Sequence, residues 1–142
     1  MKNKILTGKF TPCVTNTWTK WESYVVFNGN IKKFRSNWEA VFWLLNTDLD
    51  YEKIRIPYKI LNDDKIYIVD FSDDINKILY EIKPQSVLNT PKNNAKIKFA
   101  KEWCEKNGWR YVIITDEWYK ENAKTVDYSI NPQLKNSMKK FI

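Results

Sequence analysis

Histidine is absent from the 142 residues, and glycine occurs only three times. Without histidine, the Ser-His and Cys-His nucleophilic systems and nucleases with a histidine base are excluded. The three glycines form neither a GxGxxG motif nor a phosphate-cradling P-loop, so no nucleotide cofactor is expected. Any catalysis would therefore have to use carboxylates, lysines or a metal ion.

Cysteine and long hydrophobic runs are also scarce. Cys13 and Cys104 are the only cysteines and form no CxxC pair, which predicts buried thiols instead of a zinc site or a disulfide. No run approaches the roughly 20 apolar residues of a membrane span, and residues 1–9 have no apolar signal-peptide core. These absences predict a soluble intracellular protein without a membrane partner.

The residues that are present favour a globular domain. Hydrophobic residues make up 43% and aromatic residues 15% of the chain, enough to offset the entropy of ordering a backbone. We expect a single domain over 1–142, with an N-terminal extension and hairpin at 1–35, a core at 36–122 and a basic tail at 123–142. The net charge of +7 favours a polyanionic partner, although lysine-rich surfaces also serve solubility alone.

Periodicity and turn signals predict helices and strands in the order α-βββ-α-β-α. A hairpin of 24–27 and 31–34 is expected first, joined through Asn28-Gly29-Asn30. Ser36 and Glu39 form a capping box for a helix over 37–46 with Trp38, Val41, Phe42 and Leu45 on one face. The later elements, by residue range, are a strand at 53–60 in which Pro57 indicates an edge position or a bulge, strands at 65–71 and 77–83, a helix at 93–107 capped by Gly108, a buried central strand at 111–115 and a helix at 116–123. The fold class is α/β (α+β), a mixed sheet flanked by helices.

Two acids lie inside the strands at 65–71 and 77–83. If their turn is centred between Ile75 and Asn76, paired residue numbers sum to 151 and Asp70 lies opposite Glu81. Strand alternation would put Asp70, Glu81 and Lys83 on one face. The other face would carry Val69, Phe71, Tyr80 and Ile82.

Like charges that face each other across strands are destabilising unless something positive lies between them. Mg²⁺ takes one or two carboxylates and completes its shell with water and phosphate, and Lys83 would project beside such an ion. The alternative is that the two acids face solvent and Lys83 pairs with one of them.

"VDF" at 69–71 and "EIK" at 81–83, with ten residues between the acids, resemble the PD-(D/E)-x-K nuclease motif, with Val69 in the proline position. The surrounding "RSNWE", "IRIPY", "YEIKP" and "EKNGWRYVIIT" extend the resemblance over 34–118. The chain resembles the N-terminal domain of the TnsA transposon endonuclease and, more closely, the small head-completion nucleases of tailed phages. The early "GKFTP" at 8–12 is also similar to the start of those phage proteins.

This resemblance implies a restriction-endonuclease-like fold and a role for each matching residue. Asp70 and Glu81 would be the main Mg²⁺ ligands, with Mn²⁺ as a substitute, Ile82 would contribute its backbone carbonyl, and Lys83 would be the catalytic lysine. Glu39 would complete the metal site, or its carboxylate would cap its own helix, since both roles need the same oxygens.

Basic and aromatic residues supply candidate DNA contacts. The basic residues expected to contact DNA are Lys33, Arg35, Lys92 and Lys96. The resemblance adds Gln85, which follows the motif where such nucleases often keep a polar residue. For any single lysine, a solvated helix face is the competing interpretation. Trp18 and Trp21 could stack on bases or close the core, whereas Trp38, Trp43, Trp103 and Trp109 are expected to pack.

The predicted function is a metal-dependent DNA endonuclease of low sequence specificity. The resemblance implies a phage-encoded protein that acts in head completion or DNA packaging, in the host cytoplasm or with the virion, with capsid or portal proteins as further partners. One alternative is a virion assembly protein that retains a nuclease fold. A second is a junction resolvase or transposase-type nuclease.

Overall fold

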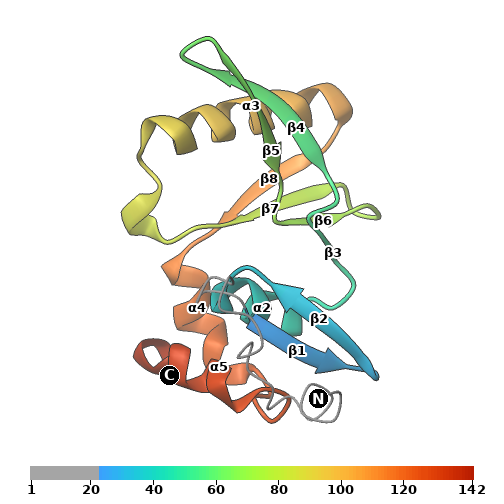
Figure 1. Cartoon of the computed structure of the whole chain (residues 1–142), viewed down its shortest axis with the longest axis vertical. Coiled ribbons are helices and arrows are strands. Elements are labelled where there is room, and N and C mark those ends of the chain that lie inside the picture. Colours follow the sequence, from blue (N-terminus) through green and yellow to red (C-terminus); the bar gives the residue numbers. More distant parts are fainter. Residues whose placement is uncertain (1–22) are drawn as a thin grey trace. The chain divides into compact units, whose positions relative to one another are not determined.

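The computed structural model describes residues 23–142, which form two compact units (Figure 1). Among these residues, the terminal unit comprises 23–47 and Tyr119–Ile142, and the central unit comprises Asp48–Trp118. The predictions for 8–12, Cys13, Trp18 and Trp21 lie outside the described residues. Among the helices of the described part, none combines the length and the apolar character that a membrane crossing needs.

The terminal unit combines a β-hairpin with helices from both ends of the chain. Its elements are β1 (Ser23–Phe27), β2 (Asn30–Phe34), α2 (Asn37–Leu44), η3 (Ala123–Thr125), α5 (Pro132–Ser137) and η4 (Lys139–Phe141). The predicted hairpin is confirmed, because β1 pairs antiparallel with β2 and the turn residues Asn28 and Gly29 both have positive φ.

Aromatic packing holds the terminal unit together. The Trp38 ring lies 4.4 Å from that of Tyr119 and 5.5 Å from that of Phe141, measured between centroids. Trp43 packs against Phe27 at 5.0 Å. The packing roles predicted for both tryptophans are confirmed, and the basic tail is folded, with Leu134, Met138 and Phe141 buried. Leu45, predicted on the buried face of α2, is 39% exposed because it ends the helix as its C-cap.

The central unit contains a four-stranded mixed sheet and a two-stranded ribbon. Its strands are β3 (Asp50–Tyr51), β4 (Arg55–Ile60), β5 (Asp63–Ile68), β6 (Phe71–Asp73), β7 (Ile78–Ile82) and β8 (Arg110–Ile114), and its helices are η2 (Gln85–Val87), α3 (Pro91–Asn107) and the start of α4 (Asp116–Asn122). The sheet order is β3-β6-β7-β8, with β7 and β8 parallel, and β4 pairs with β5 in the ribbon. The mixed α/β class is therefore confirmed.

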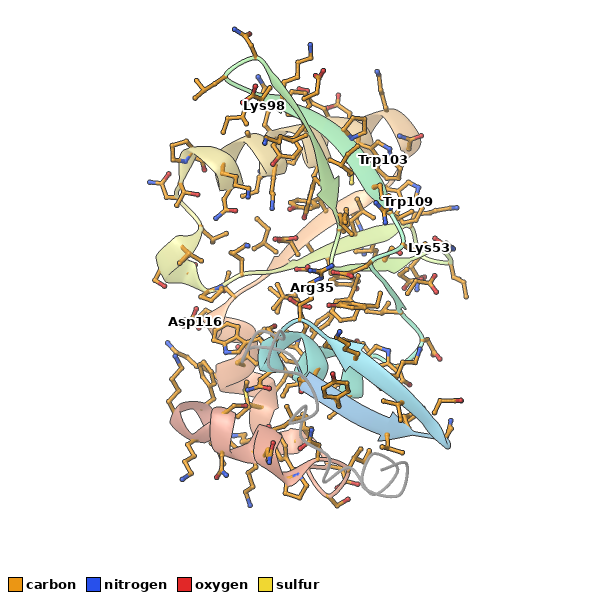
Figure 2. The ribbon with its side chains drawn as sticks, viewed as in Figure 1. Arg35, Lys53, Lys98, Trp103, Trp109 and Asp116 are labelled. Carbon is orange, nitrogen blue, oxygen red and sulfur yellow. The ribbon has the colours of Figure 1, made fainter. Side chains whose placement is uncertain are left out.

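Helix α3 packs on the strands and closes the core of the central unit. Gly108, with φ 74°, ends it in the left-handed conformation, as the sequence predicts. The helix begins at Pro91, two residues before the predicted start, with Thr90 as its N-cap. Trp103 and Trp109 pack edge to face at 5.4 Å (Figure 2). The buried residues of the core are Ile56, Tyr58, Tyr67, Val69, Leu79, Ala100 and Cys104.

The continuous strand predicted over 65–71 is wrong, because the chain changes pairing partner at Val69 and Asp70. Strand β5 belongs to the ribbon and β6 to the sheet. Between them the Val69 amide donates to the Ile54 carbonyl at 2.9 Å, and the Asp70 carbonyl accepts from the Glu52 amide at 3.0 Å. This break changes the facing of Val69, which packs with Leu79 in the core and not with Phe71 as predicted.

Two further strand predictions have different outcomes. The edge position of the strand with Pro57 is confirmed, since β4 pairs only with β5 within residues 23–142. The central position predicted for the strand at 111–115 is wrong, because β8 ends the sheet order in the described part of the chain. Tyr111, Val112 and Ile113 of β8 are only partly buried, whereas Ile114 is buried.

Candidate active site

The hairpin of β6 and β7 sets the geometry of the candidate site. Phe71 pairs with Tyr80, Ser72 with Leu79 and Asp73 with Ile78, so the predicted register with a sum of 151 is confirmed. Asp70 and Glu81 lie one step beyond the Phe71–Tyr80 pair, where Asp70 Oδ2 accepts a hydrogen bond from the Ile82 amide at 2.7 Å. Because β6 and β7 keep this register, Asp70 is fixed against the end of β7.

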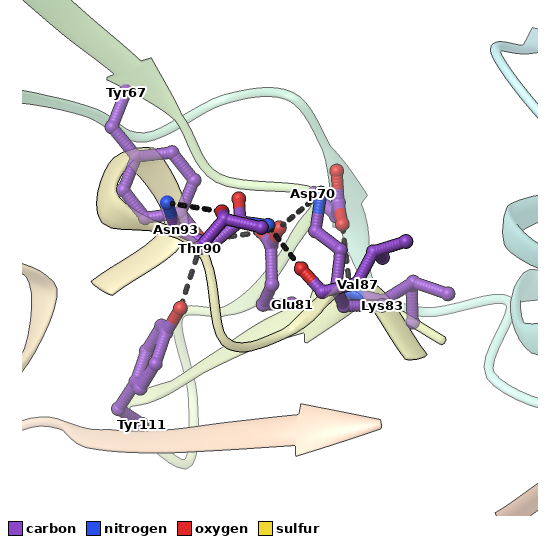
Figure 3. A network of polar contacts seen from close by, with 9 residues as sticks. Tyr67, Asp70, Glu81, Lys83, Val87, Thr90, Asn93 and Tyr111 are labelled. Atoms are coloured by element: carbon purple, nitrogen blue, oxygen red, sulfur yellow. Dashed lines mark hydrogen bonds and ion pairs between the residues drawn. The ribbon is translucent and has the colours of Figure 1, made fainter. Parts of the chain in front are cut away.

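Glu81 is a buried carboxylate with a different partner on each oxygen. Only 5% of the residue is exposed. The Tyr67 hydroxyl donates to Glu81 Oε1, and Lys83 Nζ lies 3.5 Å from Glu81 Oε2 (Figure 3). A buried charge is expensive unless it is paired and hydrogen-bonded, and these two donors meet that need. The expected proximity of Glu81 and Lys83 is therefore observed.

Two tyrosines that the sequence did not single out extend this network. The Tyr67 and Tyr111 hydroxyls are 3.0 Å apart, which links β5 and β8 to Glu81 on β7. Burial, followed by the negative charge of Glu81, raises the pKa of both phenols far above the usual range, so both stay protonated. Strand alternation could have placed Tyr67 on the buried face, but no motif indicates that it meets an acid.

Lys96 of α3 lies in the electric field of the same acids. Its ammonium is 5.4 Å from the centre of the Tyr67 ring. Burial is the main cause that lowers the pKa of Lys96, and the charges of Lys83 and Lys92 add to it, whereas Glu81 and Asp70 raise it. Lys96 is therefore partly buried near Glu81 and Asp70, and it does not lie on a fully solvated face of α3.

The other two DNA candidates of the central unit are more exposed. Lys92 lies on the first turn of α3, and Gln85 is the exposed first residue of η2. The Gln85 backbone amide donates to Asp116 Oδ1 at 2.8 Å, which anchors the segment that follows Lys83. Figure 2 labels Asp116 at the start of α4.

Glu39, Lys33 and Arg35 belong to the terminal unit and are not in the same compact unit as Asp70 and Glu81. Ser36 Oγ accepts from the Glu39 amide at 3.1 Å, so the serine half of the predicted capping box is observed. The part of Glu39 in a metal site stays a prediction.

The donor set can be compared with the needs of a divalent ion. Within residues 23–142, no group of three or more His, Cys, Asp or Glu side chains is arranged to hold a metal. Asp70, Glu81 and the Ile82 carbonyl are hard oxygen donors, and Mg²⁺ commonly takes one or two carboxylates and completes its shell with water and phosphate. The residues present fit a solvated Mg²⁺ with few protein ligands.

A mixed sheet whose central hairpin carries two acids and a lysine in this spacing defines the class of PD-(D/E)-x-K nucleases. The family model described as TnsA-like endonuclease N terminal matches residues 45–116, and the chain belongs to this family. The matched region covers most of the central unit and does not include Glu39. Comparisons with curated proteins and with solved structures give no match. The chain is thus an endonuclease-family protein, for which DNA is the expected substrate.

Proposed function

We propose that this chain is a Mg²⁺-dependent endodeoxyribonuclease of low sequence specificity in which Asp70, Glu81 and Lys83 perform the chemistry. The observation that carries the proposal is the proximity of an acid, a buried acid and a lysine at one end of β7, in a chain of an endonuclease family. Mn²⁺ is expected to replace Mg²⁺, because both ions favour carboxylate and water oxygens.

In the proposed reaction, Asp70, Glu81 and the Ile82 carbonyl would hold the ion, and Glu39 would complete its surroundings. When bound, the ion supplies positive charge to the scissile phosphate and to the attacking water. Lys83 orients this water and helps to remove its proton. The water oxygen forms a bond to phosphorus as the P–O3′ bond breaks in line. The proton of the water passes to bulk solvent and the departing O3′ takes a proton from solvent, which leaves a 5′-phosphate and a 3′-hydroxyl.

We further propose that Lys33, Arg35, Gln85, Lys92 and Lys96 contact the DNA backbone. Lysine and arginine neutralise phosphates whatever the base sequence, which accounts for low specificity. The chain also resembles phage head-completion nucleases in "GKFTP" and "YEIKP", and this resemblance supports a role in head completion or DNA packaging.

The direct test is cleavage of supercoiled plasmid with Mg²⁺ or Mn²⁺. Wild type should convert the plasmid to nicked and linear forms, and Lys83→Ala and Asp70→Ala should each lose about 100-fold or more in rate, the range for removing general acid–base and charge-stabilising groups. Loss of all cleavage when EDTA removes the metal is expected as well.

Lys53 and Asp74 provide matched controls for the lysine and the aspartate. They form an exposed ion pair between the segment that follows β3 and the β6–β7 turn. Lys53→Ala and Asp74→Ala should cleave at nearly the wild-type rate. Intact plasmid with wild type under both metals, or equal rates for Lys83→Ala and wild type, would reject the proposal.

A further inference from the structure

We infer that Tyr67 and Tyr111 are positioning residues that hold the Glu81 carboxylate by its Oε1 atom and leave Oε2 as the oxygen that faces the reaction. This inference rests on the proposed function, since it assigns how one of the proposed ligands is presented. Figure 3 shows the two rings and Glu81 joined in one chain of contacts.

The direction of the hydrogen bonds follows from counting protons. Each phenol has one proton to donate. The Tyr67 hydroxyl donates to Glu81 Oε1, so in its contact with Tyr111 the Tyr67 oxygen must accept. Tyr111 is therefore the donor of the 3.0 Å bond, and the chain of donation runs from Tyr111 to Tyr67 to Glu81. Such a chain strengthens the terminal bond, because each donor is polarised by the next.

The network restrains Glu81 from outside its own strand. Tyr67 is 1% exposed and belongs to the ribbon strand β5, while Tyr111 lies on β8 beside Leu79 of β7. Lys83, two residues after Glu81, lies at the opposite oxygen. With Oε1 bonded to a buried phenol, rotation of the carboxylate is opposed, and a metal ion would find a single oxygen of Glu81 in a fixed direction.

A purely structural role would not need these polar groups. Apolar residues of similar size at buried ionic positions are often as stable or more stable, because they avoid the cost of desolvation. The burial of these polar groups is explained if Glu81 is required as a metal ligand and the two tyrosine hydroxyls orient its carboxylate. Hydrogen bonds to the ligands of a metal are a common means of such orientation.

The test measures Mn²⁺ binding by calorimetry in the full chain, without DNA. Tyr67→Phe should weaken the affinity by about 10-fold to 100-fold, as is typical when a group that orients a metal ligand is removed, and Tyr111→Phe should have a smaller effect in the same direction. Tyr58→Phe is the matched control, because Tyr58 is a buried tyrosine of the same core whose ring packs near Phe99. It should bind Mn²⁺ as wild type does.

A double-mutant cycle identifies the path of the effect. If Tyr67 acts through Glu81, Tyr67→Phe should change Mn²⁺ affinity far less in a Glu81→Gln background than in wild type, and the two substitutions should also be coupled in denaturant unfolding of the metal-free protein. Wild-type affinity in Tyr67→Phe, or additive effects in the cycle, would overturn the inference alone. If wild type binds no Mn²⁺, the proposed function and this inference fail together.

Discussion

At the scale of single residues, Lys96 and Lys98 permit a comparison between a lysine near the candidate site and a lysine on the exposed surface of the same helix. Lys96 is half-buried above the Tyr67 ring, while Lys98, two residues on, is exposed (Figure 2). We predict that Lys96→Ala lowers the cleavage rate about tenfold or more, because a charge-assisted hydrogen bond to phosphate is worth about 1.5–3 kcal/mol. Plasmid cleavage at fixed salt measures the change.

Lys98→Ala is the control on the same helix. It removes the same charge from an exposed position, so its rate should stay within about twofold of wild type, in line with the small and screened effects of exposed charges. Equal losses in the two variants would mean that Lys96 acts only through the overall charge of α3.

The register of the β6–β7 hairpin could be predicted from the sequence, but the hydrogen bonds that link Tyr67 and Tyr111 to Glu81 could not. A polar turn between two apolar runs fixes which residues face each other, and this is enough to bring Asp70 near Glu81. Tyr67 bonds to Glu81 and Tyr111 bonds to Tyr67, from strands whose positions depend on the ribbon and on the crossover through α3. Contacts of that kind depend on tertiary packing and leave no periodic signal in the sequence.

At the scale of elements, helix α2 permits a test of the two roles of Glu39. Ser36 caps this helix through the Glu39 amide, so Ser36→Ala should cost about 1 kcal/mol of unfolding free energy with little change in cleavage. Glutamine still serves in a capping box, so Glu39→Gln should keep the stability but lower the cleavage rate if the carboxylate serves the metal. Denaturant unfolding and plasmid cleavage of both variants measure this.

The opposite pattern would assign Glu39 to the cap. In that case Glu39→Gln cleaves as wild type does, while Glu39→Ala loses stability by an amount similar to Ser36→Ala. A helix dipole effect alone would change stability and leave the rate unaltered.

Strand positions were harder to predict than strand existence. Helix α3 is predicted from the sequence because Gly108 marks its C-terminal end and its apolar residues repeat with the helical period. The division at Val69 and Asp70 was missed, since an extended chain can change hydrogen-bonding partner without any change in residue type. An apolar run such as 111–115 also predicts burial better than it predicts a place in the order of strands.

At the scale of the whole molecule, charge is divided unequally between the two units. Within the described residues, the terminal unit (23–47 and 119–142) contains eight basic and three acidic residues, a net charge of +5. The central unit contains twelve basic and thirteen acidic residues, a net charge of −1. The unit with the proposed catalytic residues therefore has little net attraction for a polyanion. We expect most of the non-specific affinity for DNA to come from the terminal unit.

Salt dependence provides the measurement. Lys33→Ala with Arg35→Ala removes two of these charges and should reduce the slope of log affinity against log salt by about 1–2, since each phosphate contact contributes about 0.9 on duplex DNA. Fluorescence anisotropy with EDTA present would record binding without cleavage. The control removes two charges from the ribbon, Lys59→Ala with Lys65→Ala, and should change the slope less.

The change of partner strand at Val69 and Asp70 has a mechanical consequence. The ribbon carries Tyr67, the sheet carries Glu81, and Asp70 lies where the backbone passes from one to the other. A rotation of the ribbon about Val69 and Asp70 would move the Asp70 carboxylate and, in the same motion, lengthen the hydrogen bond from Tyr67 to Glu81. A bound duplex that displaced the ribbon would thereby change the distance between the carboxylates of Asp70 and Glu81.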